Sequence, residues 1–157
     1  MRIGHGIDVH RVSDDPLRPL WLGLVVIPGA AGLIGHSDAD VATHALCDAI
    51  LGGANLGDLG RHFPDDDDAS TGISSRELLQ ASLELVGVAG YKVISADVTI
   101  IADRPKLVDF MPSMCVELSE VVGTVVSVKA TTVEGLGALG RAEGIGATAV
   151  VLLEEIL

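Results

Sequence analysis

The sequence has few aromatic residues and few cations. It contains one Trp, one Tyr and two Phe among 157 residues, and 10 Lys plus Arg against 22 Asp plus Glu, for a formal net charge of -12. With 48% apolar residues, the core is therefore built of Val, Ile, Leu and Ala, which argues against disorder. The acidic balance disfavours non-specific binding to nucleic acid or to an anionic membrane. An anionic substrate would need local help from metal ions, backbone N–H groups or a few placed cations.

Cysteines and long apolar runs are also scarce. Cys47 and Cys115 lie in apolar helical patterns without a partner at metal-binding spacing, so we predict that both are reduced core residues. No apolar run approaches the roughly 18 residues that span a bilayer, and the N-terminus lacks a signal-peptide pattern. We therefore expect a cytoplasmic protein with a single domain over residues 1–157 and no membrane partner.

Hydrophobic periodicity predicts strands separated by helical segments, which is typical of an α/β sheet with helices on one face. The first two strands are expected to pair as a hairpin, and the last strand is apolar on both faces. Ser37 is the expected start of the first helix, with Asp40 as a capping-box partner. The predicted strands span 2–10, 20–27, 91–102, 125–132 and 145–157, and the predicted helices begin near Ser37, Ser74 and Pro112 and end at Gly52-Gly53, Gly90 and Gly123.

A polar stripe in the first predicted helix indicates a possible metal site. Asp40, His44 and Asp48 recur every four residues, so they share one helix face. Asp8 and His10 lie two residues apart in the first strand and share its side. If strand and helix are neighbours, two histidines and a carboxylate can form a zinc shell with one open position. The alternative is a half-buried His44 bonded to Asp8 or Asp48 beside an ordinary edge strand, and the spacing alone leaves both possibilities open.

Two other segments carry groups that suit phosphate or cations. His36 and Ser37 precede the first helix, where backbone N–H groups favour a phosphate oxygen, although the pair taken alone is more simply explained as a plain serine N-cap with an incidental histidine. Thr131, Thr132 and Glu134 offer hydroxyls and a carboxylate for phosphate and a hard divalent cation. The alternative for these three is strand-end propensity and a solvated glutamate.

Six short blocks occur in an order that identifies a family. They are GHGIDVHR, HSDADVATHAL, LGDLGRHFPD, DVTIIADRPK, KATTVEGLG and GRAEGI, and they span nearly the whole chain. In this order they resemble the signature blocks of the 2-C-methyl-D-erythritol 2,4-cyclodiphosphate synthases. The resemblance implies a phosphorus-oxygen lyase of the non-mevalonate pathway of isoprenoid (terpenoid) biosynthesis. Such an enzyme converts 4-diphosphocytidyl-2-C-methyl-D-erythritol 2-phosphate to the 2,4-cyclodiphosphate and releases CMP.

The resemblance also implies an architecture and cofactors. We expect an α/β domain with a four-stranded mixed β-sheet and helices packed on one face, assembled as a homotrimer through its sheet faces with active sites between subunits. Asp8, His10 and His44 would hold one Zn²⁺ per chain, and Glu134 a second divalent cation, Mg²⁺ or Mn²⁺. In this family the substrate's 2-phosphate attacks its own β-phosphorus, so the reaction is a metal-assisted intramolecular phosphoryl transfer.

Matching positions carry further implied roles. His36 and Thr132 would be catalytic residues that stabilise the transferring phosphate. Asp58 and its neighbours would border the methylerythritol part, and a neighbouring chain would supply the cytidine pocket from residues 102–108. The full set that the resemblance assigns to the substrate is Asp8, Val9, His10, His36, Ser37, Asp58, Leu59, Gly60, Phe63, Pro64, Asp65, Asp66, Asp67, Ala102, Asp103, Arg104, Pro105, Lys106, Leu107, Val108, Thr131, Thr132, Val133, Glu134, Ala138 and Arg141.

The sequence departs from the family pattern at three positions. Ala39 stands where a glycine is common, and we expect a helix start to tolerate it. Ala138 and Leu139 stand where phenylalanine and threonine are frequent. The resemblance therefore does not define the lining of the central cavity or the phosphate contact in this segment. Two other functions fit the same residues. One is a metal-dependent phosphohydrolase in which water attacks, and the other is a non-catalytic trimer that binds an isoprenoid or a nucleotide.

Overall fold

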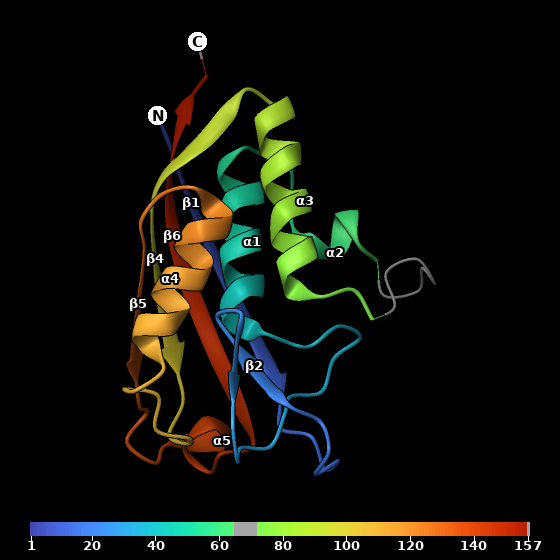
Figure 1. Ribbon diagram of the computed structural model, residues 1–157, viewed down its shortest axis with the longest axis vertical. Coiled ribbons are helices and arrows are strands. Elements are labelled where there is room, and N and C mark those ends of the chain that lie inside the picture. The colour runs from blue at the N-terminus through green and yellow to red at the C-terminus, as the bar shows by residue number, and fades with distance from the viewer. Residues whose placement is uncertain (65–71, 157) are drawn as a thin grey trace.

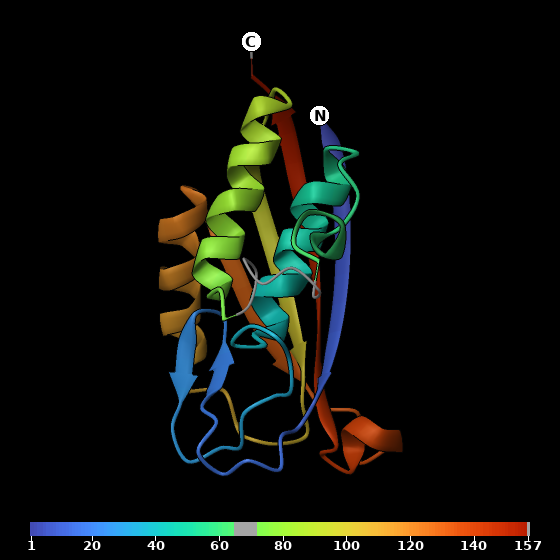
Figure 2. The same cartoon turned by 90° about the vertical axis from the view of Figure 1, so that its right-hand side faces the viewer.

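The computed structural model describes residues 1–64 and 72–156 (Figure 1). Over these residues a four-stranded sheet in the order β1-β6-β4-β5 is covered on one face by α1, α3 and α4 (Figure 2), which confirms the predicted fold class. No helix in these ranges is both long and apolar enough to cross a membrane. The elements are β1 (Arg2–Arg11), β2 (Leu20–Leu22), β3 (Val25–Ile27), α1 (Val41–Gly53), α2 (Leu59–His62), α3 (Ser75–Val88), β4 (Tyr91–Ile101), α4 (Met111–Val122), β5 (Val126–Thr131), α5 (Gly137–Gly140) and β6 (Gly144–Glu155).

Strand β6 is a central strand of the sheet. It pairs antiparallel with both β1 and β4, and β5 runs parallel to β4, so the sheet is mixed. The opposite face of the sheet leaves apolar side chains exposed: Ile3 and Ile7 of β1 and Val150 of β6 are 75%, 61% and 45% exposed. The inward side chains of β6 are buried under the helices: Ile145, Ala147, Ala149, Val151 and Leu153.

Two glycines bring β1 into direct contact with α1. A Cβ atom on Gly4 would lie 1.8 Å from the carbonyl oxygen of Ala49, and one on Gly6 would lie 2.1 Å from that of Ala45. Only glycine allows so close an approach of two backbones. Because Asp8 and His10 continue the same side of β1, this packing brings both to the N-terminal turns of α1.

The predicted hairpin between the first two strands is wrong. Residues 20–27 form a hairpin of their own, in which β2 pairs with β3 and Leu20 lies opposite Ile27. Its turn residues Gly23 and Leu24 have φ angles of 57° and 64°, the left-handed pair that matches the twist of two tightly joined strands. Strand β1 instead pairs along its length with β6, at the other end of the chain.

Helix α1 begins at Val41, four residues later than the predicted start at Ser37. Asp40 is therefore the N-cap itself and not a capping-box partner. Its Oδ1 accepts hydrogen bonds from the backbone N–H groups of Ala42 and Thr43, each at 3.1 Å. A side chain that caps a helix in this way replaces backbone partners missing in the first turn.

Asp40 also joins α1 to the β2–β3 hairpin. Its two carboxylate oxygens accept from the backbone N–H groups of Gly23 at 2.9 Å and Leu24 at 2.7 Å, and the residue is fully buried. Ala39 precedes this cap with a φ of 58°, in the left-handed region where glycine is free of steric strain. The departure at Ala39 thus lies in the loop before the N-cap and not within the helix start, where we expected it.

The ends of α3 and α4 follow local signals. Ser74 and Glu77 form the predicted reciprocal capping box, and Gly123 ends α4 with a φ of 79°. The one-turn helices α2 and α5 were not predicted, because four residues carry no measurable periodicity. Both cysteines are free, as predicted, but only Cys47 is a core residue, since Cys115 is half-buried.

Candidate active site

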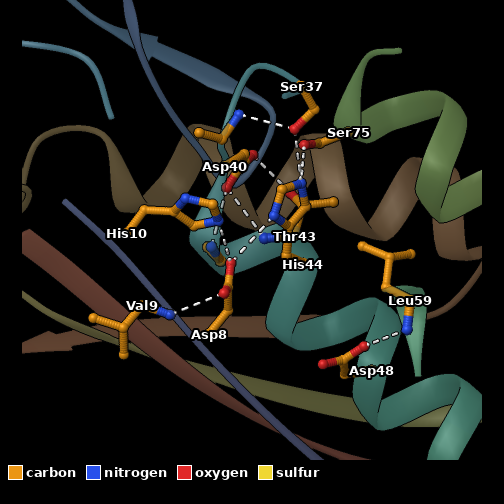
Figure 3. A network of polar contacts seen from close by, with 12 residues as sticks. Asp8, Val9, His10, Ser37, Asp40, Thr43, His44, Asp48, Leu59 and Ser75 are labelled. Atoms are coloured by element: carbon orange, nitrogen blue, oxygen red, sulfur yellow. Dashed lines mark hydrogen bonds and ion pairs between the residues drawn. The ribbon is translucent and has the colours of Figure 1, made fainter. Parts of the chain in front are cut away.

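Asp8, His10 and His44 meet where β1 passes the start of α1 (Figure 3). Nε2 of His10 lies 3.1 Å, and Nδ1 of His44 3.2 Å, from the same carboxylate oxygen, Oδ2 of Asp8. The ligand atoms of these three residues all lie within 4.8 Å of one another, and no other group of three does so in the part of the chain that the structure describes. The structure thus brings together the strand residues and the helix residue that the sequence had paired.

The electrostatics of this metal triad (Asp8, His10 and His44) favour a bound cation. Burial raises the pKa of the Asp8 carboxyl, but its contacts with His10 and His44 outweigh this effect and hold that pKa well below its usual value. The same bond to Asp8 is the main reason that the pKa of His10 lies above its usual value. The triad therefore places an ionised carboxylate between two imidazole nitrogens.

The ring of His10 is oriented by the backbone. Its Nδ1 lies 2.5 Å from the carbonyl oxygen of Ile34, and a carbonyl can only accept, so Nδ1 carries the proton. In the neutral ring Nε2 then carries the lone pair, and this nitrogen faces Asp8, where a cation would be bound. A histidine that donates its other N–H to a carbonyl is a common arrangement in protein metal sites.

The donor set of the triad fits a divalent metal ion. Two imidazole nitrogens and one carboxylate oxygen are ligands typical of zinc with three protein groups and an open position. The triad opens into a cavity of ≈ 290 Å³. The predicted substrate residues that line this metal-side cavity are Asp8, His10, His36, Ser37, Leu59, Gly60 and Phe63.

The other two members of the predicted polar stripe do not join the triad. Asp40 is buried as the cap of α1. Asp48 accepts from the backbone N–H of Leu59 at 2.8 Å and so fixes the start of α2 beside the cavity. Burial is the largest influence on the pKa of Asp48, which lies above its usual value although the bond to Leu59 lowers it. Asp58 is the N-cap of α2 and accepts from the backbone N–H of Arg61 at 3.0 Å, outside the lining of the cavity.

The predicted nucleotide residues line a second cavity of ≈ 330 Å³, here called the nucleotide-side cavity. It shares no lining residue with the metal-side cavity. Arg104 does not line it and faces a neighbouring hollow instead. Pro64 follows the metal-side residues in sequence, and Asp65, Asp66 and Asp67 lie outside the described residues. The predicted residues in the nucleotide-side cavity are Ala102, Asp103, Pro105, Lys106, Leu107, Val108, Thr131 and Thr132.

Asp103 joins the two loops at the edge of this second cavity. Its carboxylate oxygens accept from the backbone N–H groups of Val133 and Gly135, each at 3.2 Å. Between them, Glu134 has a φ of 54°, and its Oε1 accepts from the hydroxyl of Thr132 at 2.7 Å. Glu134 is exposed and does not belong to the cluster of the metal triad.

The glycine-rich segment lies at the end of the sheet that carries α5 (Figure 1). Ala138 and Leu139 line a hollow of ≈ 590 Å³ together with Val9 and His10. Arg141 is exposed and pairs with Glu143, its Nε lying 2.6 Å from Oε1. These positions are therefore next to the first strand but belong to neither of the two cavities described above.

Sequence reasoning missed two residues behind the triad, of which Ser75 contacts His44 directly and Asp38 acts through Ser75. Ser75 is fully buried, and its Oγ lies 3.0 Å from Nε2 of His44. Asp38 contacts Ser75 through both carboxylate oxygens. The capping-box pattern pointed to Ser74 and left its neighbour Ser75 without a role, although Asp38 is the aspartate of the HSD block.

An α/β domain with two histidines and a carboxylate in a cavity defines a candidate divalent-metal enzyme. The chain matches the YgbB family over residues 1–154 and belongs to that family. It is 54% identical to the 2-C-methyl-D-erythritol 2,4-cyclodiphosphate synthase of Syntrophotalea carbinolica, over 99% of this chain and 95% of that one. It is 51% identical to the synthase of Vibrio cholerae serotype O1, over 99% of each. These relatives are named as enzymes and confirm the family resemblance drawn from the six sequence blocks.

Solved structures give the same assignment. A cyclodiphosphate synthase in its CDP-bound form has a TM-score of 0.88 and 38% identity, over 98% of this chain and 100% of that one. The bifunctional IspDF of Campylobacter jejuni has a TM-score of 0.93 and 39% identity over 99% of this chain. The present chain spans only 42% of that bifunctional protein.

Proposed function

We propose that this chain is a cytoplasmic cyclodiphosphate synthase that converts 4-diphosphocytidyl-2-C-methyl-D-erythritol 2-phosphate to 2-C-methyl-D-erythritol 2,4-cyclodiphosphate and CMP. The observation that carries the proposal is the metal triad. The ligand atoms of Asp8, His10 and His44 lie within 4.8 Å of one another in the lining of a cavity, in a chain about half identical to synthases over nearly its whole length. This combination supports metal-assisted phosphoryl transfer over binding alone.

The triad would hold zinc, and Glu134 a magnesium or manganese ion. Zinc there would supply a Lewis acid that neutralises charge on the β-phosphate, and the second ion would neutralise charge on the diphosphate. The exposed carboxylate of Glu134 and its hydroxyl neighbour Thr132 are oxygen ligands of the kind that hard cations prefer. The two divalent cations would offset the repulsion between a chain of net charge -12 and a polyanionic substrate.

The chain's own residues position the substrate. An oxygen of its 2-phosphate forms a bond to the β-phosphorus, the bond from that phosphorus to the bridging oxygen breaks, and CMP leaves with the electron pair. No protein nucleophile is needed, so positioning and charge neutralisation carry the catalysis. His36 and Ser37 line the metal-side cavity and donate to the phosphate there. Thr132 lines the nucleotide-side cavity and stabilises the transferring group from that side.

The active site is shared between subunits of a homotrimer. Two observations support this part of the proposal. The metal-side and nucleotide-side cavities have no lining residue in common, and one face of the sheet leaves Ile3, Ile7 and Val150 exposed. An apolar sheet face of this kind is suited to burial against other copies. One chain then supplies the triad, with Asp58 and its neighbours around the methylerythritol part, and the next chain supplies the cytidine pocket.

A ³¹P NMR time course tests the reaction. The purified protein is incubated with the diphosphocytidyl substrate and Mg²⁺, with and without a zinc chelator. We expect CMP and the cyclic diphosphate to appear together and both to be lost on chelation. CMP with an uncyclised phosphate product would replace the proposal with a phosphohydrolase. No turnover by a folded, metal-loaded trimer would replace it with a binding protein.

A further inference from the structure

The far side of the His44 ring faces a buried hydroxyl. Nε2 of His44 points away from Asp8 and lies 3.0 Å from Oγ of Ser75, the first residue of α3 (Figure 3). Ser75 has no solvent exposure. Oγ of Ser37 lies 3.2 Å from the same nitrogen. The imidazole is therefore held from behind by serines that come from two different segments of the chain.

Asp38 fixes the direction of the Ser75 hydroxyl. One carboxylate oxygen of Asp38 is hydrogen-bonded to Oγ of Ser75, and the other accepts from the backbone N–H of Ser75 at 2.9 Å. An ionised carboxylate can only accept, so the Ser75 hydroxyl donates its single proton to Asp38. Its oxygen is left with lone pairs, and Nε2 of His44 is the donor that remains for them.

We propose that Asp38 and Ser75 form a hydrogen-bond relay that holds His44 in its Nε2–H form and turns Nδ1 toward the metal. The proposal rests on the proposed function only in taking His44 as a metal ligand. In this form Nδ1 presents a lone pair 3.2 Å from Oδ2 of Asp8. Two acceptors so close repel each other unless a cation lies between them. The relay therefore favours binding of a cation between His44 and Asp8.

The two histidine ligands are controlled in different ways. His10 donates to the backbone carbonyl of Ile34, which no side-chain substitution removes. His44 depends on Ser75, a side chain on a helix 31 residues away. Ser75 is thus a positioning residue whose removal is expected to loosen one ligand while it leaves the other in place.

In the competing arrangement Ser37, and not Ser75, is the hydrogen-bond partner that fixes the tautomer of His44. Oγ of Ser37 accepts from the backbone N–H of Ala39 at 3.0 Å, so its own proton is available. If Ser37 donated that proton to Nε2, His44 would carry its proton on Nδ1 and donate it to Asp8. The two arrangements place the proton of His44 on opposite ring nitrogens, so they are separable by experiment.

Zinc affinity is the first readout, measured by competition with a chelating indicator on the full-length protein. We expect Ser75→Ala to weaken zinc binding by about 10- to 100-fold, the usual effect of removing a group that orients a metal ligand. Ser75→Thr restores the hydroxyl and is expected to recover most of the affinity. Ser82→Ala is the matched control, because Ser82 is equally buried on the same helix but bonds to the carbonyl of Leu78 at 2.8 Å.

The tautomer of His44 is the second readout and needs no variant. In ¹⁵N-histidine NMR spectra of the zinc-loaded protein we expect a slowly exchanging Nε2–H on His44 and metal-bound Nδ1. Zinc affinity of Ser75→Ala equal to that of Ser82→Ala, or a proton found on Nδ1, would overturn the relay. Both readouts are independent of turnover, so failure of cyclase activity would refute the proposed function and leave the relay to be judged on its own.

Discussion

The metal-side and nucleotide-side cavities are built in different ways. Around the metal triad, each histidine has a second hydrogen-bond partner behind the ring, Ile34 for His10 and Ser75 for His44. At the nucleotide side, Lys106 and Thr132 are exposed on loops. The metal half of the site is therefore organised by buried contacts within one chain, whereas Lys106 and Thr132 of the nucleotide half lie at the surface, where they are accessible to a substrate.

This contrast has a functional meaning under the proposed mechanism. A metal site must hold its ligands within narrow limits, because small misplacements weaken coordination. A substrate pocket can leave polar groups solvated until the substrate replaces water. Substitutions at the metal side are thus expected to change metal content and turnover, and substitutions at the nucleotide side to change substrate affinity.

Replacing His44 with Ala is expected to have the largest effect. It removes one of three protein ligands, so bound zinc should fall below one per chain and turnover by more than about 10³-fold. Elemental analysis and the ³¹P assay measure the two quantities. His5→Ala is the matched control, because His5 lies on β1, the strand of Asp8 and His10, but contacts Thr148 instead of the triad. Undiminished zinc in His44→Ala would contradict the ligand assignment.

Replacing Asp40 and Asp103 in turn compares how much one buried and one half-buried carboxylate stabilise the fold near the two cavities. Asp40 is fully buried and accepts from four backbone N–H groups and the Thr43 hydroxyl, so Asp40→Ala should lower the free energy of unfolding by about 3 kcal/mol or more. Asp103 is half-buried and makes two long bonds to Val133 and Gly135, so Asp103→Ala should cost about 1 kcal/mol. Urea unfolding of metal-free protein gives both values. Equal losses in the free energy of unfolding would contradict the difference in stabilisation predicted for the two carboxylates.

Replacing Glu134 with Gln tests the second cation. The substitution keeps an oxygen that can accept from Thr132 but removes the charge. We expect the Mg²⁺ or Mn²⁺ concentration for half-maximal activity to rise at least about tenfold, with zinc content unchanged at one per chain. An unaltered metal titration would refute the role of Glu134.

Replacing Lys106 with Ala should have the smallest effect on catalysis. Lys106 is exposed beside the nucleotide-side cavity, and loss of one charge-assisted contact to the substrate is expected to raise KM about tenfold. Turnover at saturation and zinc content should stay close to those of the unaltered protein. A fall in zinc content would show that the two halves of the site are not separate.

Local sequence predicted the parts of the fold that local forces determine. The capping box of Ser74 and Glu77 and the glycine end of α4 at Gly123 depend on neighbouring residues. The start of α1 was missed because Asp40 is held in place partly by Gly23 and Leu24 of the distant β2–β3 hairpin. The strand pairing was missed because β1 finds its partner at the other end of the chain, a choice made by packing and not by turn chemistry.

The candidate site likewise contains residues that local sequence predicted and one residue that depends on how the helices pack. Asp8 and His10 share a strand side, and His44 lies on the helix that the family blocks placed beside that strand, so spacing and resemblance together predicted the triad. Ser75 was not predicted, because its contact with His44 depends on how α3 packs against α1. No local pattern in the sequence reports that packing.

The central claim is that each active site combines the metal half of one subunit with the nucleotide half of the next, and mixed trimers test it most directly. His44→Ala and Thr132→Ala subunits, each inactive alone, are unfolded together and reassembled in equal amounts. If the halves come from different subunits, about a quarter of the sites regain both intact halves, and activity returns. Activity that stays at the level of the two separate variants would contradict a shared site.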